Sequence, residues 1–173
     1  NASFTIQLIS QPSGDVIIAI TSSDTSEGVV PSDNQSLTFT SSNWSSEQTV
    51  TVVGQDDLLR DGNVPYAIEI SVNSGSTLDS NYAKLNPTAI YLNNRDDEYA
   101  GVRVSAPSAS TTSESGDNVT FNVSLNTVPI YNVTFPVYTS DSTEALLVPQ
   151  GGGSVGDNIT LTFNAGNSST ITL

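Results

Sequence analysis

Residues 118–125 have the sequence Asn-Val-Thr-Phe-Asn-Val-Ser-Leu, in which polar and apolar side chains alternate at every position. Because successive side chains of a β-strand point to opposite faces, this pattern predicts a strand with one solvated face and one buried face. Similar alternating segments recur along the chain, at residues 4–8, 16–20, 37–39, 50–52, 67–70 and 90–92. Turn-forming residues lie between them, at residues 12–15, 33–36, 61–63 and 151–153. The sequence therefore predicts an all-β chain of short antiparallel strands, arranged as a sandwich.

An internal repeat relates the two halves of the chain. Matching residues lie 117 positions apart, as Asp24 and Asp141 do. The other matches at this spacing are Ser3 and Phe4 with Thr120 and Phe121, Leu8 with Leu125, and Glu27 with Glu144. After gaps that fall in turns, residues 37–40 also resemble 161–164, and residues 49–52 resemble 169–172. The chain therefore contains two copies of one domain.

The two copies cover different parts of the repeat. Copy two begins with residues 101–105, which have no counterpart in copy one, and it stops before any counterpart of residues 55–98. We therefore expect two tandem immunoglobulin-like β-sandwiches, at residues 1–98 and 99–173, the first without its first strand and the second without its C-terminal strands. A missing strand leaves an unpaired edge. We expect a preceding segment of a longer chain to supply this strand, and strand addition from a neighbouring subunit is the alternative.

The charge and composition of the chain exclude several classes of function. The 173 residues include 18 acidic and four basic side chains, for a net charge of −14, so we expect no nucleic-acid partner. The absence of Cys, Met and His removes disulfides, thiol nucleophiles and the commonest general base, so we expect no enzymatic activity. No apolar run approaches the length of about 20 residues that a membrane span needs, so we expect no membrane insertion.

Carboxylates are concentrated where the predicted strands end. In copy one they fall in three separated segments, at residues 24–27, 56–61 and 96–98. If neighbouring strands alternate in direction, these segments converge at one pole of the sandwich and offer many hard oxygen ligands. Ca²⁺ binds about six to eight such oxygens, and without a cation the carboxylates would repel one another. The pattern therefore predicts Ca²⁺ as a bound cofactor.

The order of motifs in copy one resembles the Calx-beta type of calcium-binding repeat, which is found in large bacterial surface proteins. Examples are Ser-Ser-Asp-Thr-Ser-Glu-Gly at residues 22–28 and Asn-Asn-Arg-Asp-Asp-Glu at residues 93–98. The remaining motifs lie at residues 37–44, 48–52, 56–62 and 81–87, so that the resemblance covers nearly all of copy one. It implies a seven-stranded sandwich similar to immunoglobulin domains, with calcium bound at the pole near the next domain.

The resemblance also implies a set of calcium ligands. In copy one they are Asp56, Asp57, Asp61, Asp96 and Asp97, together with Asp24 and Glu98, and in copy two they are Glu114 and Asp141. Val64 stands where the family often has an acid, which predicts fewer ions or weaker binding. Because residues 96–98 directly precede copy two, we expect an ion there to stiffen the junction. We expect five other acids of copy one to lie on a solvated surface, namely Asp15, Asp33, Glu47, Glu69 and Asp79.

Eight Asn-x-Ser/Thr triplets are candidate glycosylation sites. They begin at Asn1, Asn34, Asn43, Asn118, Asn122, Asn132, Asn158 and Asn167. A chain rich in Asn, Ser and Thr also produces such triplets by chance, so both interpretations stay open. We expect Trp44, the single Trp, to anchor packing at a strand edge rather than to form a sugar-binding platform.

Together these features predict a structural function outside the cell. We expect a calcium-stiffened repeat of an extracellular adhesin, stalk or surface fibre, which spaces a distal binding element from the cell. Its partners would be neighbouring repeats or subunits of the same protein. One alternative is a module that binds a carbohydrate or protein ligand at the cell surface. Another is a subunit of an extracellular filament that is completed by strand donation.

Overall fold

The computed structural model describes residues 1–149, 155–166 and 171–172. The expected all-β fold is confirmed, and the one helical segment among these residues is the short 3-10 helix η1 (Tyr82–Lys84). The chain divides into two compact units. The first consists of Asn1–Asp57 and Asp61–Asp96, and the second consists of Leu58–Arg60 and Asp97–Leu173.

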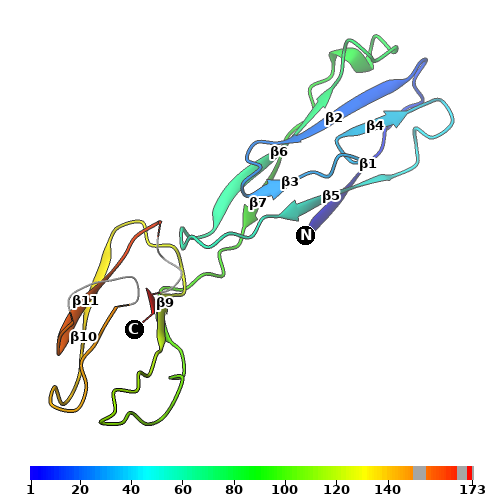
Figure 1. Ribbon diagram of the computed structural model, residues 1–173. Helices are drawn as coiled ribbons and strands as arrows, with labels where there is room; N and C mark the ends of the chain where they lie inside the picture. The colour runs from blue at the N-terminus through cyan, green and yellow to red at the C-terminus, as the bar shows by residue number, and fades with distance from the viewer. Residues whose placement is uncertain (150–154, 167–170, 173) are drawn as a thin grey trace. The chain divides into compact units, whose positions relative to one another are not determined.

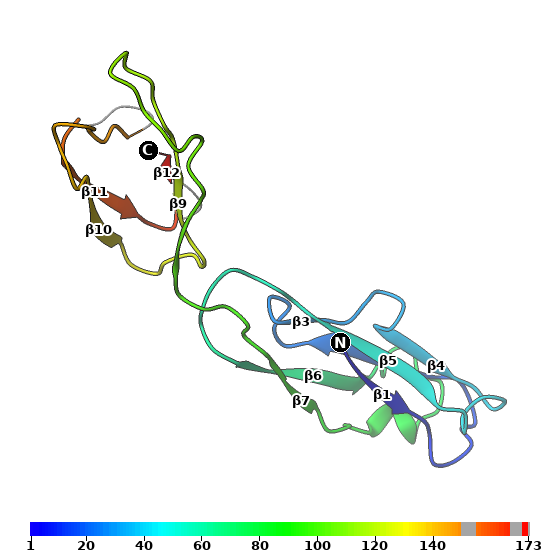
Figure 2. The ribbon, with the colours of Figure 1, turned by 90° about the horizontal axis from the view of Figure 1, so that it is seen from below.

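The first unit consists of two antiparallel sheets (Figure 1). One sheet has the strand order β4-β2-β6-β7, formed by β4 (Ser36–Phe39), β2 (Val16–Ser22), β6 (Val64–Val72) and β7 (Ile90–Asn94). The other has the order β1-β5-β3, formed by β1 (Ala2–Ile6), β5 (Gln48–Gly54) and β3 (Gly28–Val29). In Figure 2, β1 lies beside β5, which is the single strand that pairs with it within the described residues.

One hydrophobic core joins the two sheets of the first unit. Phe39 of β4 and Ile68 of β6 are fully buried in it, and Val50 of β5 contributes from the other sheet. In β4 the side chains alternate between buried and exposed, because apolar residues occupy every second position. Trp44 packs against this core, as the sequence indicated. Burial of each large apolar side chain contributes about 1.5–3 kcal/mol to stability.

Asp79 is buried in the first unit, so the expectation that it lies on a solvated surface was wrong. Its side chain is 4 % exposed. One carboxylate oxygen accepts hydrogen bonds from the backbone N–H and the hydroxyl of Ser13, both at 2.8 Å. The other accepts from the N–H groups of Asn81, at 2.8 Å, and Tyr82, at 3.2 Å. These bonds favour the charged carboxylate, those from Ser13 most strongly, and lower the pKa of Asp79 to about 2.

The second unit also contains two antiparallel sheets. One has the order β12-β9-β8, formed by β12 (Ile171–Thr172), β9 (Asn122–Leu125) and β8 (Val102–Val104). The other pairs β10 (Val133–Tyr138) with β11 (Asn158–Phe163). Val123 and Phe163 are buried in its core, where the ring of Phe163 stacks on that of Phe135 at a centroid distance of 5.8 Å.

Strand pairing follows the same register in both units. In the first unit, β2 pairs with β4 so that Val16 lies opposite Phe39. In the second, β10 pairs with β11 so that Val133 lies opposite Phe163. Val16 and Val133 are 117 residues apart, which is the spacing of the sequence repeat. The repeat therefore corresponds to a repeated pair of strands.

The predicted strand at residues 118–125 is shorter in the structure, where β9 begins at Asn122. The N–H groups of Thr120 and Asn122 donate to serine hydroxyls instead of to backbone carbonyl oxygens of a neighbouring strand. The hydroxyl of Ser108 accepts from the N–H of Thr120, and the hydroxyl of Ser105 accepts from the N–H of Asn122, both at 2.9 Å. Such side-chain bonds compete with a regular ladder, which explains why alternation alone predicted too long a strand.

Candidate metal centre

The acidic segments that follow β5 and β7 are brought together by Asn94, the last residue of β7. Its side-chain nitrogen donates hydrogen bonds to the carbonyl oxygen of Gln55, at 2.6 Å, and to Oε2 of Glu27, at 3.2 Å. The N–H of Gln55 donates to the carbonyl oxygen of Glu27 at 2.9 Å. These contacts join the ends of β5 and β7 to the residue that precedes β3. The acids that follow both strands therefore start from neighbouring positions.

Glu27 is a buried acid at this end of the first unit, with 9 % of its surface exposed. The neighbouring Gly28 packs so closely on the ring of Tyr66 that a Cβ atom at residue 28 would overlap it. Burial, and then the negative charge of Glu27, raise the pKa of the Tyr66 hydroxyl. Glu27 thus adds negative charge beside the segment that carries the candidate ligands.

Asp96 holds the two acidic segments together. Its Oδ2 atom accepts a hydrogen bond from the N–H of Gly62 at 2.6 Å, and its own N–H donates to Oδ1 of Asn63 at 3.1 Å. Gly62 has a φ of +85°, in the left-handed region that favours glycine. The segment after β5 is therefore fastened to the segment after β7 at two points, and one carboxylate oxygen of Asp96 is already engaged.

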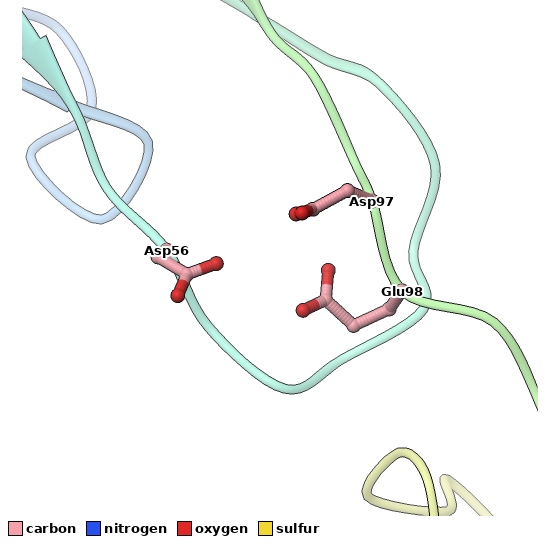
Figure 3. A group of neighbouring side chains, drawn as sticks. All are labelled: Asp56, Asp97 and Glu98. Atoms are coloured by element: carbon pink, nitrogen blue, oxygen red, sulfur yellow. The ribbon is translucent and has the colours of Figure 1, made fainter.

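Asp56, Asp97 and Glu98 form a group that could hold a metal ion, and it is the one such group found among the described residues. Figure 3 shows the carboxylate of Asp56 facing those of Asp97 and Glu98 from the opposite segment. One oxygen from each residue lies within 4.8 Å of the other two. Oxygens that share one Ca²⁺ lie about 2.3–2.6 Å from the ion, so their mutual distances reach about 5 Å. The spacing of the three carboxylates fits a single shared cation.

The structure brings together three of the nine ligands that the family resemblance implied. Asp57 and Asp61 are exposed on the same segment as Asp56 but lie outside the group. Asp96 also lies outside it and bonds to the backbone of Gly62.

Asp24 and Asp141 each stabilise a turn of their own unit. Asp24 accepts hydrogen bonds from the hydroxyl and the N–H of Ser26, and these bonds lower the pKa of Asp24. Asp141 accepts from the hydroxyl of Thr143 at 2.6 Å and from its N–H at 2.9 Å, and these bonds lower the pKa of Asp141. Both residues lie outside the carboxylate group. The two turns are 117 residues apart, so they are equivalent parts of the repeat.

The remaining candidate residues are either exposed at the surface or half-buried and hydrogen-bonded within their own unit. Glu114 is exposed and outside the carboxylate group. Asn43 is half-buried, and its side-chain nitrogen, to which a glycan would attach, donates to the carbonyl oxygen of Thr38 at 3.2 Å. Asn34 is also half-buried and accepts a hydrogen bond from the N–H of Thr51 at 2.8 Å. The exposed sequon residues are Asn1, Asn118, Asn122, Asn132 and Asn158, while Asn167 lies outside the described residues.

Sequence reasoning missed the part played by Asn94 and treated Glu27 only as one more acid. The contact between Asn94 and the end of β5 depends on Gly54, where a Cβ atom would lie 2.9 Å from Oδ1 of Asn94. A glycine at a strand end is a weak signal for such an approach. The signal does not identify the partner, because β5 and β7 belong to different sheets.

Helical structure in the described residues is limited to η1, which is three residues long. No helix in this part of the chain is long and apolar enough to cross a membrane. No family model matches the sequence, and neither a curated protein nor a solved structure shows significant similarity to it.

Proposed function

We propose that the chain is a calcium-binding structural repeat of the Calx-beta type, in which Asp56, Asp97 and Glu98 are ligands of one Ca²⁺. The observation that carries this proposal is the 4.8 Å limit on the distances between their carboxylate oxygens. Three negative charges at this spacing repel one another, and a divalent cation relieves the repulsion. Backbone carbonyls and water would complete the six to eight oxygens that calcium takes.

The ligand chemistry favours calcium over other metals. The chain has no His or Cys, which zinc and copper prefer, so hard oxygen ligands are what it offers. Mg²⁺ needs near-ideal octahedral geometry and is usually held by one or two carboxylates. Three carboxylates from two irregular segments suit the more flexible coordination of calcium.

A calcium ion at this position would stiffen the chain. It would cross-link the segment that follows β5 with the segment that follows β7, and the latter leads directly to β8. A rigid, acidic repeat without disulfides suits a spacer in an extracellular adhesin, stalk or surface fibre, with neighbouring repeats as partners. Extracellular calcium sites have dissociation constants of about 10⁻⁴–10⁻³ M, so a site of modest affinity would be occupied outside the cell.

Calcium titration tests this proposal. We expect calorimetry to show saturable binding and the melting temperature to rise in calcium relative to EGTA. Asp56→Asn, Asp97→Asn and Glu98→Gln combined should abolish both effects. A matched control neutralises three exposed acids outside the group, Asp15→Asn, Asp33→Asn and Glu47→Gln, with the same change in net charge, and it should keep both effects. Equal loss in both variants, or no calcium effect on the unaltered chain, would overturn the proposal.

A further inference from the structure

Two of the Asn-x-Ser/Thr triplets lie on the β10–β11 sheet of the second unit, whose strands run side by side (Figure 1). In β11, Asn158 and Thr160 are exposed, while Ile159 between them is 7 % exposed and belongs to the core. At the start of β10, Asn132 and Thr134 are exposed in the same way. Because side chains alternate between the two faces of a strand, the buried middle residue turns the Asn and the Thr to solvent together.

The equivalent triplet of the first unit is arranged differently. Phe163 and Phe39 occupy the same register position in their strand pairs. Asn158 therefore corresponds to Asn34, since each lies five residues before its Phe. Asn34 is half-buried, and its Oδ1 atom accepts a hydrogen bond from the N–H of Thr51 at 2.8 Å. A bulky group on Asn34 would disturb this contact, whereas Asn158 offers an exposed side chain.

An exposed aromatic ring lies directly across the sheet from Asn158. Strand pairing places Tyr138 opposite Asn158, and Tyr138 is 72 % exposed. In the next pair along, the N–H of Thr139 donates to the carbonyl oxygen of Asp157 at 3.0 Å. Tyr138 and Asn158 are therefore a non-hydrogen-bonded pair, in which side chains lie closest, with Cβ atoms about 4.5–5.5 Å apart. A group attached to Nδ2 of Asn158 starts within reach of the ring.

The position of Tyr138 also faces outward in the four-stranded sheet of the first unit. A shift of 117 residues relates Tyr138 to Thr21 of β2. Strand β6 pairs with β2 at this point, with Glu69 opposite Thr21, and Thr21 is nonetheless exposed. Tyr138 and Asn158 therefore lie on the solvent face of their sheet, which a strand beside β10 would not cover.

We propose that Asn158 is an N-glycosylation site whose first sugar packs on the ring of Tyr138. The donor is an oligosaccharide linked to a polyprenyl diphosphate, and the enzyme is an oligosaccharyltransferase. The bond between C1 of the first sugar and the diphosphate oxygen breaks, and the polyprenyl diphosphate leaves with the electron pair. Nδ2 of Asn158 forms the new bond to C1 and loses one proton. One face of the first sugar, an N-acetylhexosamine, then covers the Tyr138 ring and removes apolar surface from water.

Secretion of the full chain from a eukaryotic host tests the modification. Glycopeptide mass spectrometry should find most of Asn158 occupied, and Thr160→Ala, which removes the hydroxyl of the triplet, should abolish occupancy there. Thr162→Ala, at the next exposed position of β11, is the matched control and should leave it unchanged. An unmodified Asn158 in the secreted chain would overturn the proposal. The inference rests on the extracellular location in the proposed function but not on calcium, so its failure is distinct from a failure of the calcium titration.

Melting temperatures measured in EGTA test the contact between the sugar and Tyr138. The glycans are first trimmed with an endoglycosidase that leaves one N-acetylglucosamine on each Asn. Asn158→Gln removes this sugar and should lower the melting temperature by about 3 °C or more. In the background of Tyr138→Thr, which introduces the residue type of Thr21, the same substitution should lower it by less than about 1 °C. Tyr91→Thr, at an exposed position of β7 opposite Ala67, is the matched control background and should keep the full effect.

Two further measurements assign the effect to the sugar and its contact with the ring. In the chain produced without glycans, Asn158→Gln should change the melting temperature by less than about 1 °C. NMR of the unaltered glycosylated chain should show contacts between sugar protons and the Tyr138 ring, which keeps the test decisive if Tyr138→Thr does not fold. An equal effect of Asn158→Gln with and without Tyr138→Thr, or a sugar without contacts to the ring, would overturn the proposal.

Discussion

The side-chain nitrogen of Asn94 lies 2.6 Å from the carbonyl oxygen of Gln55, and this hydrogen bond joins the end of β7 to the residue that follows β5. The two strands belong to different sheets. Asp56 directly follows Gln55, and Asp97 lies three residues after Asn94. The position of the candidate calcium ligands therefore depends on a neutral residue that would not itself bind the ion.

Replacement of this residue tests that dependence. Asn94→Ala removes the bonds to Gln55 and Glu27 and leaves their oxygens without this donor, so we expect a loss of about 1–3 kcal/mol in the free energy of unfolding. Calcium affinity should fall as well, because one of the contacts that hold the two acidic segments together is lost, and only those of Asp96 with Gly62 and Asn63 remain. Urea unfolding and calorimetry measure the two effects. Asn93→Ala, at the exposed neighbouring position of β7, is the control and should change neither.

The choice of ligands within the acidic segments leads to a second prediction. Asp97 belongs to the carboxylate group, and Asp61 does not, although the family resemblance implied both. Both are exposed, and each Asp→Asn substitution removes one negative charge. We expect Asp97→Asn to weaken calcium binding by about tenfold or more. Asp61→Asn should weaken it by less than about threefold, because Asp61 does not contact the ion and attracts it only through a charge that solvent and salt screen. The reverse order in calorimetry would show that the ion binds elsewhere.

Asp79 should make the first unit sensitive to acid. Its pKa lies at about 2 in the folded chain, below the ordinary value of 3.8, so the unfolded chain takes up the proton first as the pH falls. The stabilisation is therefore fully present above about pH 4 and is lost as the pH falls through about 2. Asp79→Asn should lower the melting temperature by about 5 °C or more at pH 7 and by much less at pH 2. Asp33→Asn, at an exposed position, should show no such difference between the two pH values.

Gly28 should tolerate no side chain. Its Cα lies against the buried ring of Tyr66, and a Cβ atom would overlap that ring. Gly28→Ala should therefore cost about 1–3 kcal/mol in stability, as insertion of a methyl group into a packed core does. Gly75→Ala is the matched control, because the nearest atom to its Cβ lies 3.7 Å away, and it should change stability by less than about 0.5 kcal/mol. Denaturant unfolding distinguishes the two.

Phe39 should be the most sensitive core position of β4. Its side chain is fully buried, and it lies opposite Val16 in the same register in which Phe163 lies opposite Val133. Phe39→Ala should cost about 3–5 kcal/mol through lost burial and the cavity that remains. Thr38→Ala, at the exposed neighbouring position, should cost less than about 1 kcal/mol in the same urea titration.

The strands of the first unit could be predicted because most of them bury one face only. Alternation at residues 37–39 and 50–52 identified β4 and β5, and the structure extends each by one to four residues. Strand β3 was missed, because two residues, Gly28 and Val29, are too few to show a period. The strand predicted at residues 118–125 was too long, because serine hydroxyls replace part of its ladder.

The sequence predicted that carboxylates form the candidate site, but it did not predict which of them come together. The run of acids at residues 96–98 is visible in the sequence, yet only Asp97 and Glu98 lie close to Asp56, whereas Asp96 bonds to Gly62. The burial of Asp79 could not be predicted from the sequence either. Nothing in the residues around Asp79 indicates that Ser13, which lies 66 residues away in the sequence, will donate hydrogen bonds to it.

By itself, the sequence determined the all-β class, the repeat at a spacing of 117 residues and the excess of negative charge. These depend on residue type and periodicity, which are local properties of the chain. Tertiary structure decided which acids converge and that Glu27 and Asp79 are buried. Those depend on contacts such as that between Asn94 and Gln55, whose partners are far apart in the sequence and come together only when the two sheets pack on a common core.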